Sequence, residues 1–313
     1  MKEYIYLAVC TVIMALQLQF CKIYQLKATT KKANLAFPVI TGVTAFIMFF
    51  IISGFTLAYS TFSFLIALGG AVITTAVSLI GLKIVEEVPV GLYSAFLMLG
   101  ALIIPFLYGV LALKEEVKFL MVLGIIVLIF ALVYNSVDKN EKQGKSIKGI
   151  IYCFIVFLLN GTFGVLSKIH QISPSAVETG SFLQWVTIFQ TVFSAIIFVV
   201  SIYLKKDKEV APAVDSPSDD ATVSEDDNHP QKKTSLLLII GVGACYSISW
   251  GVSFYLQLLA LKVLPVSLVN PIVTSAVIIF SWLFSLLLFK EKIKTKQIIS
   301  TALIIIGIVL FFI

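Results

Sequence analysis

Long stretches without a charged side chain are the dominant feature of this sequence. No charge lies between Lys32 and Lys83, and similar apolar runs recur along almost the whole chain. A membrane-spanning helix needs about 20 consecutive, mostly apolar residues, so a chain of this length with short loops has room for about ten spans. The apolar runs therefore predict an all-α polytopic membrane protein.

The amino-acid composition excludes a water-soluble enzyme. Hydrophobic residues make up 59% of the 313 residues and charged residues only 13%, whereas soluble chains have about 45–50% and about 25%. The mean hydropathy is +1.03. A soluble domain needs far more polar surface, and a single membrane anchor would leave most of the apolar residues unexplained.

Hydropathy and proline positions divide the chain into ten predicted spans. Pro89 and Pro265 start the fourth and ninth spans, because proline is favoured at the first position of a helix. The polar segment 205–234 holds eight acidic residues and three prolines, so we expect a disordered loop outside the bilayer. The predicted spans are 4–24, 35–57, 61–83, 89–112, 117–136, 148–168, 178–204, 235–260, 265–288 and 294–313.

The second half of the sequence repeats the first. Cys21-Lys22-Ile23-Tyr24-Gln25 near the end of the first span matches Ser167-Lys168-Ile169-His170-Gln171 near the end of the sixth. Pro89-Val90, Leu92, Lys114-Glu115 and Lys118 match Pro265-Val266, Leu268, Lys290-Glu291 and Lys294. The predicted domains are a five-helix repeat at 1–136, a short connecting loop at 137–147 and a second repeat at 148–313 that contains the acidic loop.

Each repeat holds an odd number of spans, so the two copies enter the membrane with opposite orientations. A pseudo-two-fold axis in the membrane plane then relates them. Inverted repeats of this kind are typical of secondary transporters, whose solute site lies near the bilayer midplane between the halves. The repeat therefore predicts ten transmembrane helices in two inverted five-helix units that work by alternating access.

On these residues the chain resembles the EamA-like ten-helix members of the drug/metabolite transporter superfamily. In the sixth span Asn160-Gly161-Thr162-Phe163 leads to Lys168, and the first half keeps Lys22 without the glycine. The segments Leu113-Lys114-Glu115 and Phe289-Lys290-Glu291 lie where relatives tend to have Gly-Glu-Arg/Lys. The resemblance implies a plasma-membrane solute carrier with helices one to four and six to nine around a central cavity and helices five and ten at the periphery. It implies no particular solute.

Polar side chains inside the predicted spans are the candidate solute-binding residues, because a polar group in hydrocarbon is costly unless it faces protein or a wet cavity. The seventh span carries a stripe at helical spacing of Gln184, Thr187, Thr191 and Ser194, and the eighth carries Tyr246, Trp250, Ser253 and Gln257. The predicted binding set is Gln17, Asn160, Lys168, Gln184, Gln190, Tyr246, Trp250, Ser253, Gln257 and Asn270. The alternative for each residue is a hydrogen bond between packed helices.

Charged residues limit the chemistry of the predicted site. Lys22 and Lys168 lie at span ends, where they would contact an anionic solute group, couple transport to protons or extend to the lipid headgroups. Lys114-Glu115 and Lys290-Glu291 are expected to be interfacial helix stops rather than gates. All 17 acidic residues lie in loops or at span ends, which favours neutral or zwitterionic solutes over a carboxylate-driven drug antiporter.

The sequence therefore predicts a facilitator or exchanger, with export as an open direction, of a small neutral or zwitterionic metabolite such as an amino acid or derivative. An exchanger of phosphorylated sugars or nucleotide sugars is the first alternative, although all 23 cationic residues are lysine and lysine cannot bind phosphate bidentately. A non-transporting membrane scaffold is the second. We expect no enzymatic activity, no cofactor, no metal site at the isolated His170 and His229, and no nucleic-acid partner. The expected partners are the solute and the bilayer, and a homodimer is left open.

Overall fold

A computed structural model describes residues 2–28, 31–84, 88, 90–136, 147–204, 236–289 and 295–311. In these residues the protein consists of ten α-helices and no strand, which confirms the predicted all-α class. The helices are α1 (Lys2–Lys27), α2 (Lys31–Ile52), α3 (Thr61–Ile84), α4 (Val90–Leu111), α5 (Phe119–Ser136), α6 (Ile147–Ile172), α7 (Thr179–Leu204), α8 (Leu236–Leu261), α9 (Val266–Phe289) and α10 (Thr295–Val309).

The helices have the properties of membrane spans. Eight of the described helices are long and apolar enough to cross a bilayer, and α5 and α10 carry shorter apolar segments at Phe119–Tyr134 and Thr295–Leu310. Large apolar side chains such as Ile47, Leu65 and Ile126 are more than half exposed on the outside of the bundle. Such a surface suits lipid rather than water, so the protein is a polytopic membrane protein, as predicted.

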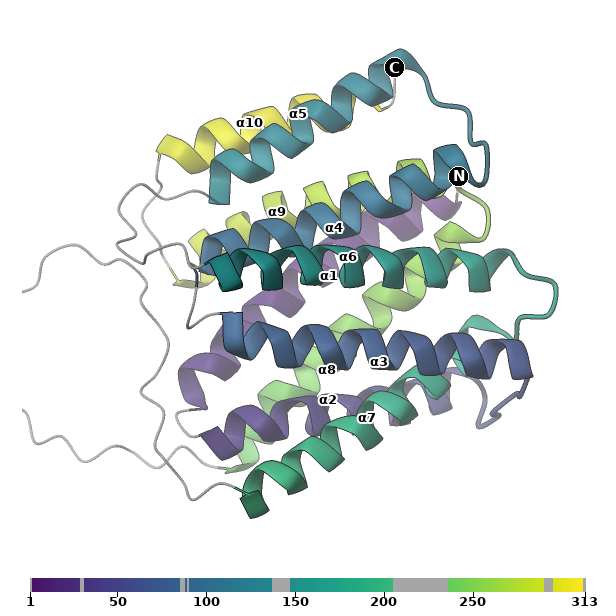
Figure 1. Ribbon diagram of the computed structural model, residues 1–313, viewed down its shortest axis with the longest axis vertical. Coiled ribbons are helices and arrows are strands. Elements are labelled where there is room, and N and C mark those ends of the chain that lie inside the picture. Colours follow the sequence, from purple (N-terminus) through teal and green to yellow (C-terminus); the bar gives the residue numbers. More distant parts are fainter. Residues whose placement is uncertain are drawn as a thin grey trace, which may run out of the picture.

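Successive helices cross the bundle in alternate directions, so α1 and α6 run in opposite directions, as do the other pairs five helices apart (Figure 1). The start of α1 and the end of α10 lie at one end of the bundle, which we call the termini end. The loops after α2, α4, α6 and α8 lie at this end and all fall within the described residues. The last residues of α1, α3, α5, α7 and α9 lie at the opposite end (Figure 1).

Helix contacts occur in pairs that are related by a shift of five helices. Helix α1 packs on α8 and α9, and α6 packs on α3 and α4; α2 packs on α8, and α7 packs on α3. Helices α2, α4 and α5 each pack on their own counterpart. Two similar units related by a two-fold axis would pack in this way. The domain boundaries stay a prediction, since residues 137–146 and the acidic loop 205–234 lie outside the described part of the chain.

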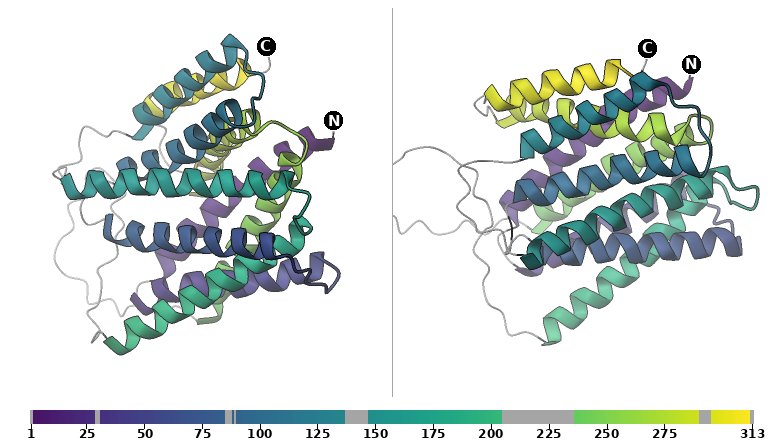
Figure 2. Two further views of the ribbon diagram at one scale, coloured as in Figure 1. Left: turned by 45° about the vertical axis from the view of Figure 1, so that its right-hand side comes forward. Right: turned by 45° about the horizontal axis from the view of Figure 1, so that its top comes forward.

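Helices α5 and α10 form a peripheral pair. They pack closely on each other, make further contacts with α4 and α9, and lie at one edge of the bundle in Figure 1 and in the left view of Figure 2. A Cβ on Gly124 would lie 2.9 Å from the carbonyl oxygen of Gly307, so the two backbones approach closely where both residues are glycine. Helices α5 and α10 are therefore peripheral, as the family resemblance implies, and they contact the other eight helices through α4 and α9.

Several predicted helix boundaries move in the structure, among them the ends of the second and sixth helices. The second helix ends at Ile52 rather than at residue 57, because Gly54 and Phe55 follow with φ angles of 63° and 62°. This left-handed conformation cannot continue a right-handed helix. The sixth helix continues to Ile172, beyond the predicted end at residue 168, so Lys168 lies one turn inside it.

Candidate functional site

An amide pair joins two of the predicted binding residues across α8 and α9. The Gln257 Nε2 donates a hydrogen bond to the Asn270 Oδ1 at 3.3 Å. Four helices meet here, because a Cβ on Gly164 of α6 would lie 2.8 Å from the Pro105 ring of α4 and 3.4 Å from the Asn270 Nδ2. Asn270 is buried, so a neutral hydrogen-bonding group lies at the junction of α4, α6, α8 and α9.

Proline weakens the backbone pairing of α9 beside this amide pair. Pro271 lies inside α9 and has no N–H, so it cannot donate to the carbonyl of Ser267 one turn earlier. The hydroxyl of Ser267 is also buried and has no hydrogen-bond partner in the described structure. The first turn of α9 therefore carries polar atoms whose hydrogen bonds are not all used within the helix.

An aromatic row continues from the amide pair along the same face of α8. The Trp250 ring stacks on Phe254 with a centroid distance of 5.6 Å, and Phe254 stacks on Phe163 of α6 at 5.7 Å. Phe49 of α2 meets the edge of Trp250 at 6.5 Å. Ser253 is buried between these residues, and its hydroxyl donates to the Trp250 carbonyl of its own helix at 2.9 Å.

Gln17 and Tyr246 extend this face toward the opposite end of the bundle. The Gln17 amide of α1 lies against the Tyr246 hydroxyl of α8. Gln17 is only 7% exposed, and its Oε1 has no hydrogen-bond partner within the described structure. The Tyr246 ring packs on Phe37 at 4.8 Å, and Phe37 packs on Tyr24 at 4.3 Å. Neutral polar groups and aromatic rings therefore alternate along one face of α8.

Three other predicted residues lie away from this face and join or flank packed helices. The Asn160 Nδ2 donates to the Leu97 carbonyl and ties α6 to α4 at 2.8 Å. The fully buried Gln184 Nε2 donates to the carbonyls of Phe49 and Thr56 at 3.0 and 3.1 Å. Gln190 is half-buried on α7. The contacts of Asn160 and Gln184 are those of the alternative interpretation, interhelical hydrogen bonding.

Lys168 lies at the termini end and binds the backbone of the α8–α9 turn. Its side chain is only 5% exposed, and its Nζ donates to the carbonyls of Leu261 and Leu264 at 2.8 and 3.0 Å. These are the last carbonyls of α8 and of the turn, where a cation is favoured by the helix dipole. The structure therefore does not bring Lys168 into the group formed by Gln257, Asn270 and Trp250.

Glu115 binds the other side of the same turn. Its Oε1 and Oε2 accept hydrogen bonds from the backbone N–H groups of Val266 and Ser267, both at 2.9 Å. These are the first N–H groups of α9, which have no partner within the helix. Lys114 precedes Glu115 with a φ angle of 54°, a left-handed conformation that turns the chain back toward α9 after the end of α4.

The role of Glu115 was missed in the sequence, where the Lys114-Glu115 pair is expected to be a helix stop. The pair does follow the end of α4, as expected for a helix stop. The Glu115 carboxylate also caps α9, which begins far along the chain. The sequence signal for this role is duplication: each repeat contains a Lys-Glu pair, and each contains a lysine at matching positions, Lys22 and Lys168. Hydropathy alone cannot distinguish a headgroup contact from a contact with another loop.

A second hydrogen-bonding network at the termini end surrounds His170. The ring is 1% exposed and stacks on Phe182 at 3.8 Å. Its Nε2 and the Ser63 hydroxyl lie 3.0 Å apart, and its Nδ1 lies 3.2 Å from the Gln171 amide nitrogen. In the described residues no group of three His, Cys, Asp or Glu side chains could hold a metal ion. His170 therefore joins α3 and α6 by packing and hydrogen bonds.

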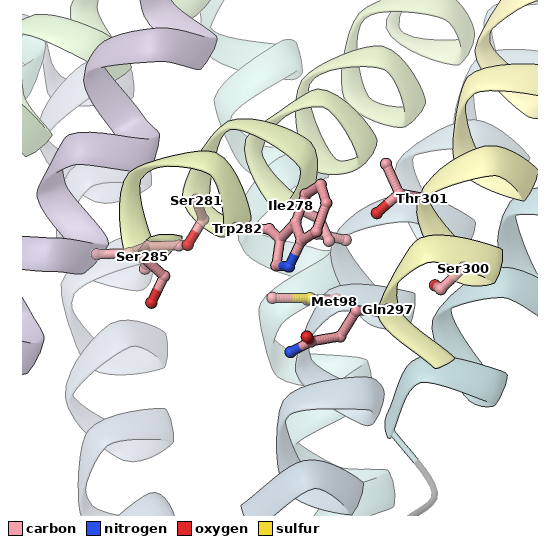
Figure 3. A pocket seen from close by; sticks show the side chains of 9 residues that line it. Met98, Ile278, Ser281, Trp282, Ser285, Gln297, Ser300 and Thr301 are labelled. Atoms are coloured by element: carbon pink, nitrogen blue, oxygen red, sulfur yellow. The ribbon is translucent and has the colours of Figure 1, made fainter. Parts of the chain in front are cut away.

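A pocket of about 250 Å³ lies between α9 and α10, apart from all ten predicted binding residues. Trp282 lies across it, with serines of α9 on one side and polar side chains of α10 on the other (Figure 3). The Trp282 indole N–H is buried without a hydrogen-bond partner in the described structure. The pocket is lined by Leu18, Met98, Ile278, Ser281, Trp282, Ser285, Gln297, Ser300 and Thr301.

The sequence did contain a signal for this pocket. Ile278, Ser281, Trp282 and Ser285 follow one another at helical spacing in α9, as Gln297, Ser300 and Thr301 do in α10. The stripes that define the predicted solute site lie instead on the seventh and eighth spans. The spacing identifies one face of a helix, but it cannot identify which neighbouring helix that face meets.

Comparison with known proteins gives a family match and matches to solved structures. The sequence profile of the EamA-like transporter family matches residues 147–313, which is more than half of the chain. A search of curated protein sequences finds no match. A crystal structure described only as that of a protein aligns with a TM-score of 0.70 and 13% identity, and the alignment covers 97% of this chain and 94% of the other. At that identity the likeness concerns the fold alone.

Proposed function

This chain belongs to the EamA-like transporter family, and on that premise we propose that it is a facilitator or exchanger of a small neutral or zwitterionic metabolite such as an amino acid or derivative. Family membership makes it a membrane transporter of small solutes. The solute class, the alternating-access mechanism and the site on α8 are our proposal. We place the solute path between α1–α4 and α6–α9, along the face of α8 that carries Tyr246, Trp250 and Gln257.

The observation that carries this proposal is the amide pair of Gln257 and Asn270 beside the aromatic row of Trp250, Phe254 and Phe163. Amides donate and accept hydrogen bonds without adding charge, so they match the carboxylate and ammonium of a zwitterion equally well. A tryptophan face also attracts an ammonium group. A zwitterionic solute with a small apolar side chain would bind to both amides, Gln257 and Asn270, and to the Trp250 ring.

The distribution of charge supports a solute without net charge. Among the described residues no Asp or Glu is fully buried, and both oxygens of the half-buried Glu115 already bind backbone N–H groups. Lys168 is the one fully buried charged residue among those described, and its Nζ is occupied by two carbonyls. An anionic sugar phosphate would find no bidentate cation in a sequence without arginine.

The proposal is tested by comparing metabolites inside and outside cells that express three forms of the protein at equal abundance. These are the parent, the double variant Trp250→Ala/Gln257→Ala, and the matched control Trp282→Ala/Gln297→Ala in the α9–α10 pocket. We expect the parent and the control to redistribute the same few neutral or zwitterionic compounds, and the α8 variant to redistribute them at least tenfold less.

Each other outcome of this comparison has a definite meaning. Loss of transport in the α9–α10 variant alone would move the solute site to that pocket and contradict the site on α8. Redistribution of phosphorylated compounds would contradict the proposed solute class. If no compound moves in any form, the scaffold alternative gains support, and deletion of residues 208–231 then tests it.

Plasma-membrane location belongs to the same proposal. The multi-pass membrane character follows from the family and from the apolar helices, but many membranes would accept such a chain. Labelling of intact cells with an impermeant amine reagent tests the location, because the chain carries 23 lysines. Chemical cross-linking of the same cells tests the homodimer that the sequence leaves open.

A further inference from the structure

The α8–α9 turn is held from both sides by charged groups that belong to other helices. Lys168 of α6 donates two hydrogen bonds to carbonyls at the end of α8 and in the turn. Glu115, just after α4, accepts two from the first N–H groups of α9. We call these two residues the α8–α9 clamp. Each charge also complements the dipole of the helix end that it binds.

The hydrogen bonds of the clamp favour one position of the turn, the closed position that the structure shows. Lys168 is almost fully buried, and a buried ammonium is costly unless its hydrogen bonds are made. If the turn moved by a few ångströms, the ammonium and the helix ends would lose these bonds unless water entered. Movement of the turn therefore requires water to replace these bonds, and partly moved positions without that water are unfavourable.

The clamp lies directly over the proposed solute site. Gln257 is four residues before Leu261 and Asn270 is four residues after Val266. At about 1.5 Å of rise per residue, the amide pair lies about 6 Å inside the clamp. Movement of the turn would expose Gln257 and Asn270 before any other part of the α8 face.

The corresponding lysine of the first repeat lies toward the opposite end of the bundle. Lys22 lies in α1 at the position that matches Lys168 in α6, and its Nζ lies 4.4 Å from the centroid of the Phe289 ring. Phe289 is the last residue of α9, at the opposite end of the bundle. The two matching lysines therefore lie toward opposite ends of the bundle, and the clamp of Glu115 and Lys168 belongs to the termini end.

We infer that Glu115 and Lys168 are positioning residues for transport: they keep the termini end closed by holding the α8–α9 turn, and their release opens the solute site to that side. The inference rests on the proposed transport function. It goes beyond that function because it assigns the closing contact to two residues that touch no solute.

The inference is tested by the accessibility of a single cysteine. The four native cysteines are replaced by alanine in the full chain, and Ser253→Cys places a thiol on the α8 face below the amide pair. Labelling with a membrane-impermeant maleimide is measured from each side of the membrane in Glu115→Gln and Lys168→Met backgrounds. The matched controls are Glu116→Gln and Lys262→Met, which change exposed charges in the same two loops.

We expect Glu115→Gln and Lys168→Met to raise the labelling rate from the termini side by about tenfold or more, because each removes charge-assisted hydrogen bonds from the closed form. Labelling from the opposite side should fall or stay constant. The two controls should label like the parent, and Lys168→Arg, which keeps the donors, should stay within about threefold of it. Hydrogen exchange across residues 257–270 in the chain with its native cysteines gives a second readout, and it should rise in the same two variants.

Two results would overturn the inference. Unchanged labelling and unchanged hydrogen exchange in both clamp variants would mean that the turn is not held by these residues. An equal rise from both sides would mean that the clamp only stabilises the fold. Transport is measured separately in the parent chain with its native Ser253 and cysteines, because Ser253 belongs to the proposed solute site. One-sided opening in the labelled chain, together with a parent that moves no metabolite, would support the clamp and contradict the proposed function. Transport by the parent with unchanged accessibility in the clamp variants would support the proposed function and contradict the clamp.

Discussion

Helices α7 and α8 carry similar polar stripes in the sequence and use them differently in the structure. On α7, Gln184 donates to two carbonyls at the end of α2 and in the following loop, and Thr187 bonds back to its own helix. On α8, Gln257 pairs with another side-chain amide, and Trp250 forms part of an aromatic row. The comparison shows that helical spacing identifies a polar face, whereas the hydrogen-bond partners indicate whether that face joins helices or remains able to bind a solute.

The largest expected effect comes from removing the α7 amide. Gln184→Leu keeps the side-chain volume but removes both hydrogen bonds to the Phe49 and Thr56 carbonyls. We expect the free energy of unfolding to fall by about 2–3 kcal/mol, because the carbonyl of the buried Phe49 and that of Thr56 lose their side-chain donor. Thermal unfolding in detergent measures the loss. Transport per folded molecule should stay within about twofold of the parent, and a tenfold loss would instead place Gln184 in the solute path.

The same substitution on α8 should have the reverse effect. Gln257→Leu removes a single long hydrogen bond to Asn270, so we expect the free energy of unfolding to change by less than about 1 kcal/mol. Transport should fall about tenfold, which corresponds to ~1.4 kcal/mol of lost solute binding in the transition state. Uptake kinetics in proteoliposomes check this. Normal transport together with a large loss of stability would remove the distinction between the two helices.

A methyl group beside the amide pair should have an intermediate effect. In Gly164→Ala the new Cβ would lie 2.8 Å from the Pro105 ring and 3.4 Å from the Asn270 Nδ2. We expect transport to fall about fivefold, or ~1 kcal/mol, because α6 must move away from α4 and α9. Gly241→Ala is the control, since a Cβ there meets no atom within 4 Å. Equal transport in the two variants would contradict a solute site at this junction.

The smallest expected effects distinguish two hydroxyls that both bond to their own helix. Thr187→Val on α7 and Ser253→Ala on α8 should each change the free energy of unfolding by less than about 1 kcal/mol, because the carbonyl acceptors keep their backbone bonds. We expect transport to fall about threefold in Ser253→Ala only. The transport rates of the two variants, measured side by side at limiting solute concentration, give this difference. A loss in Thr187→Val alone would place the solute path on α7.

Much of the architecture could be predicted from the sequence, because membrane-spanning helices are local. A run of apolar residues such as 61–83 needs no distant partner to form a helix in lipid, since its backbone bonds are all internal. The duplicated Lys-Glu and lysine positions likewise predicted two related halves. The ends of helices were less predictable, because a left-handed pair such as Gly54 and Phe55 is not marked by hydropathy.

The site was less predictable than the fold. The α8 stripe of Tyr246, Trp250 and Gln257 follows from spacing alone, and the structure brings these residues into one aromatic and polar face. The partners of Gln184 and Asn160 could not be derived in this way, because they are backbone carbonyls of other helices. A carbonyl has no sequence signature, so a glutamine that joins two helices looks the same as one that faces a cavity.

The sequence by itself determined that this protein is a helical membrane protein with two related halves, because apolar length and internal repetition are properties of the chain alone. Only the tertiary structure decided which polar groups meet. Glu115 binds Val266, and Lys168 binds Leu261, across separations of 151 and 93 residues. Such contacts depend on how complete helices pack, and hydrogen bonds over a few ångströms then decide whether a charged residue holds a turn, faces lipid or touches a solute.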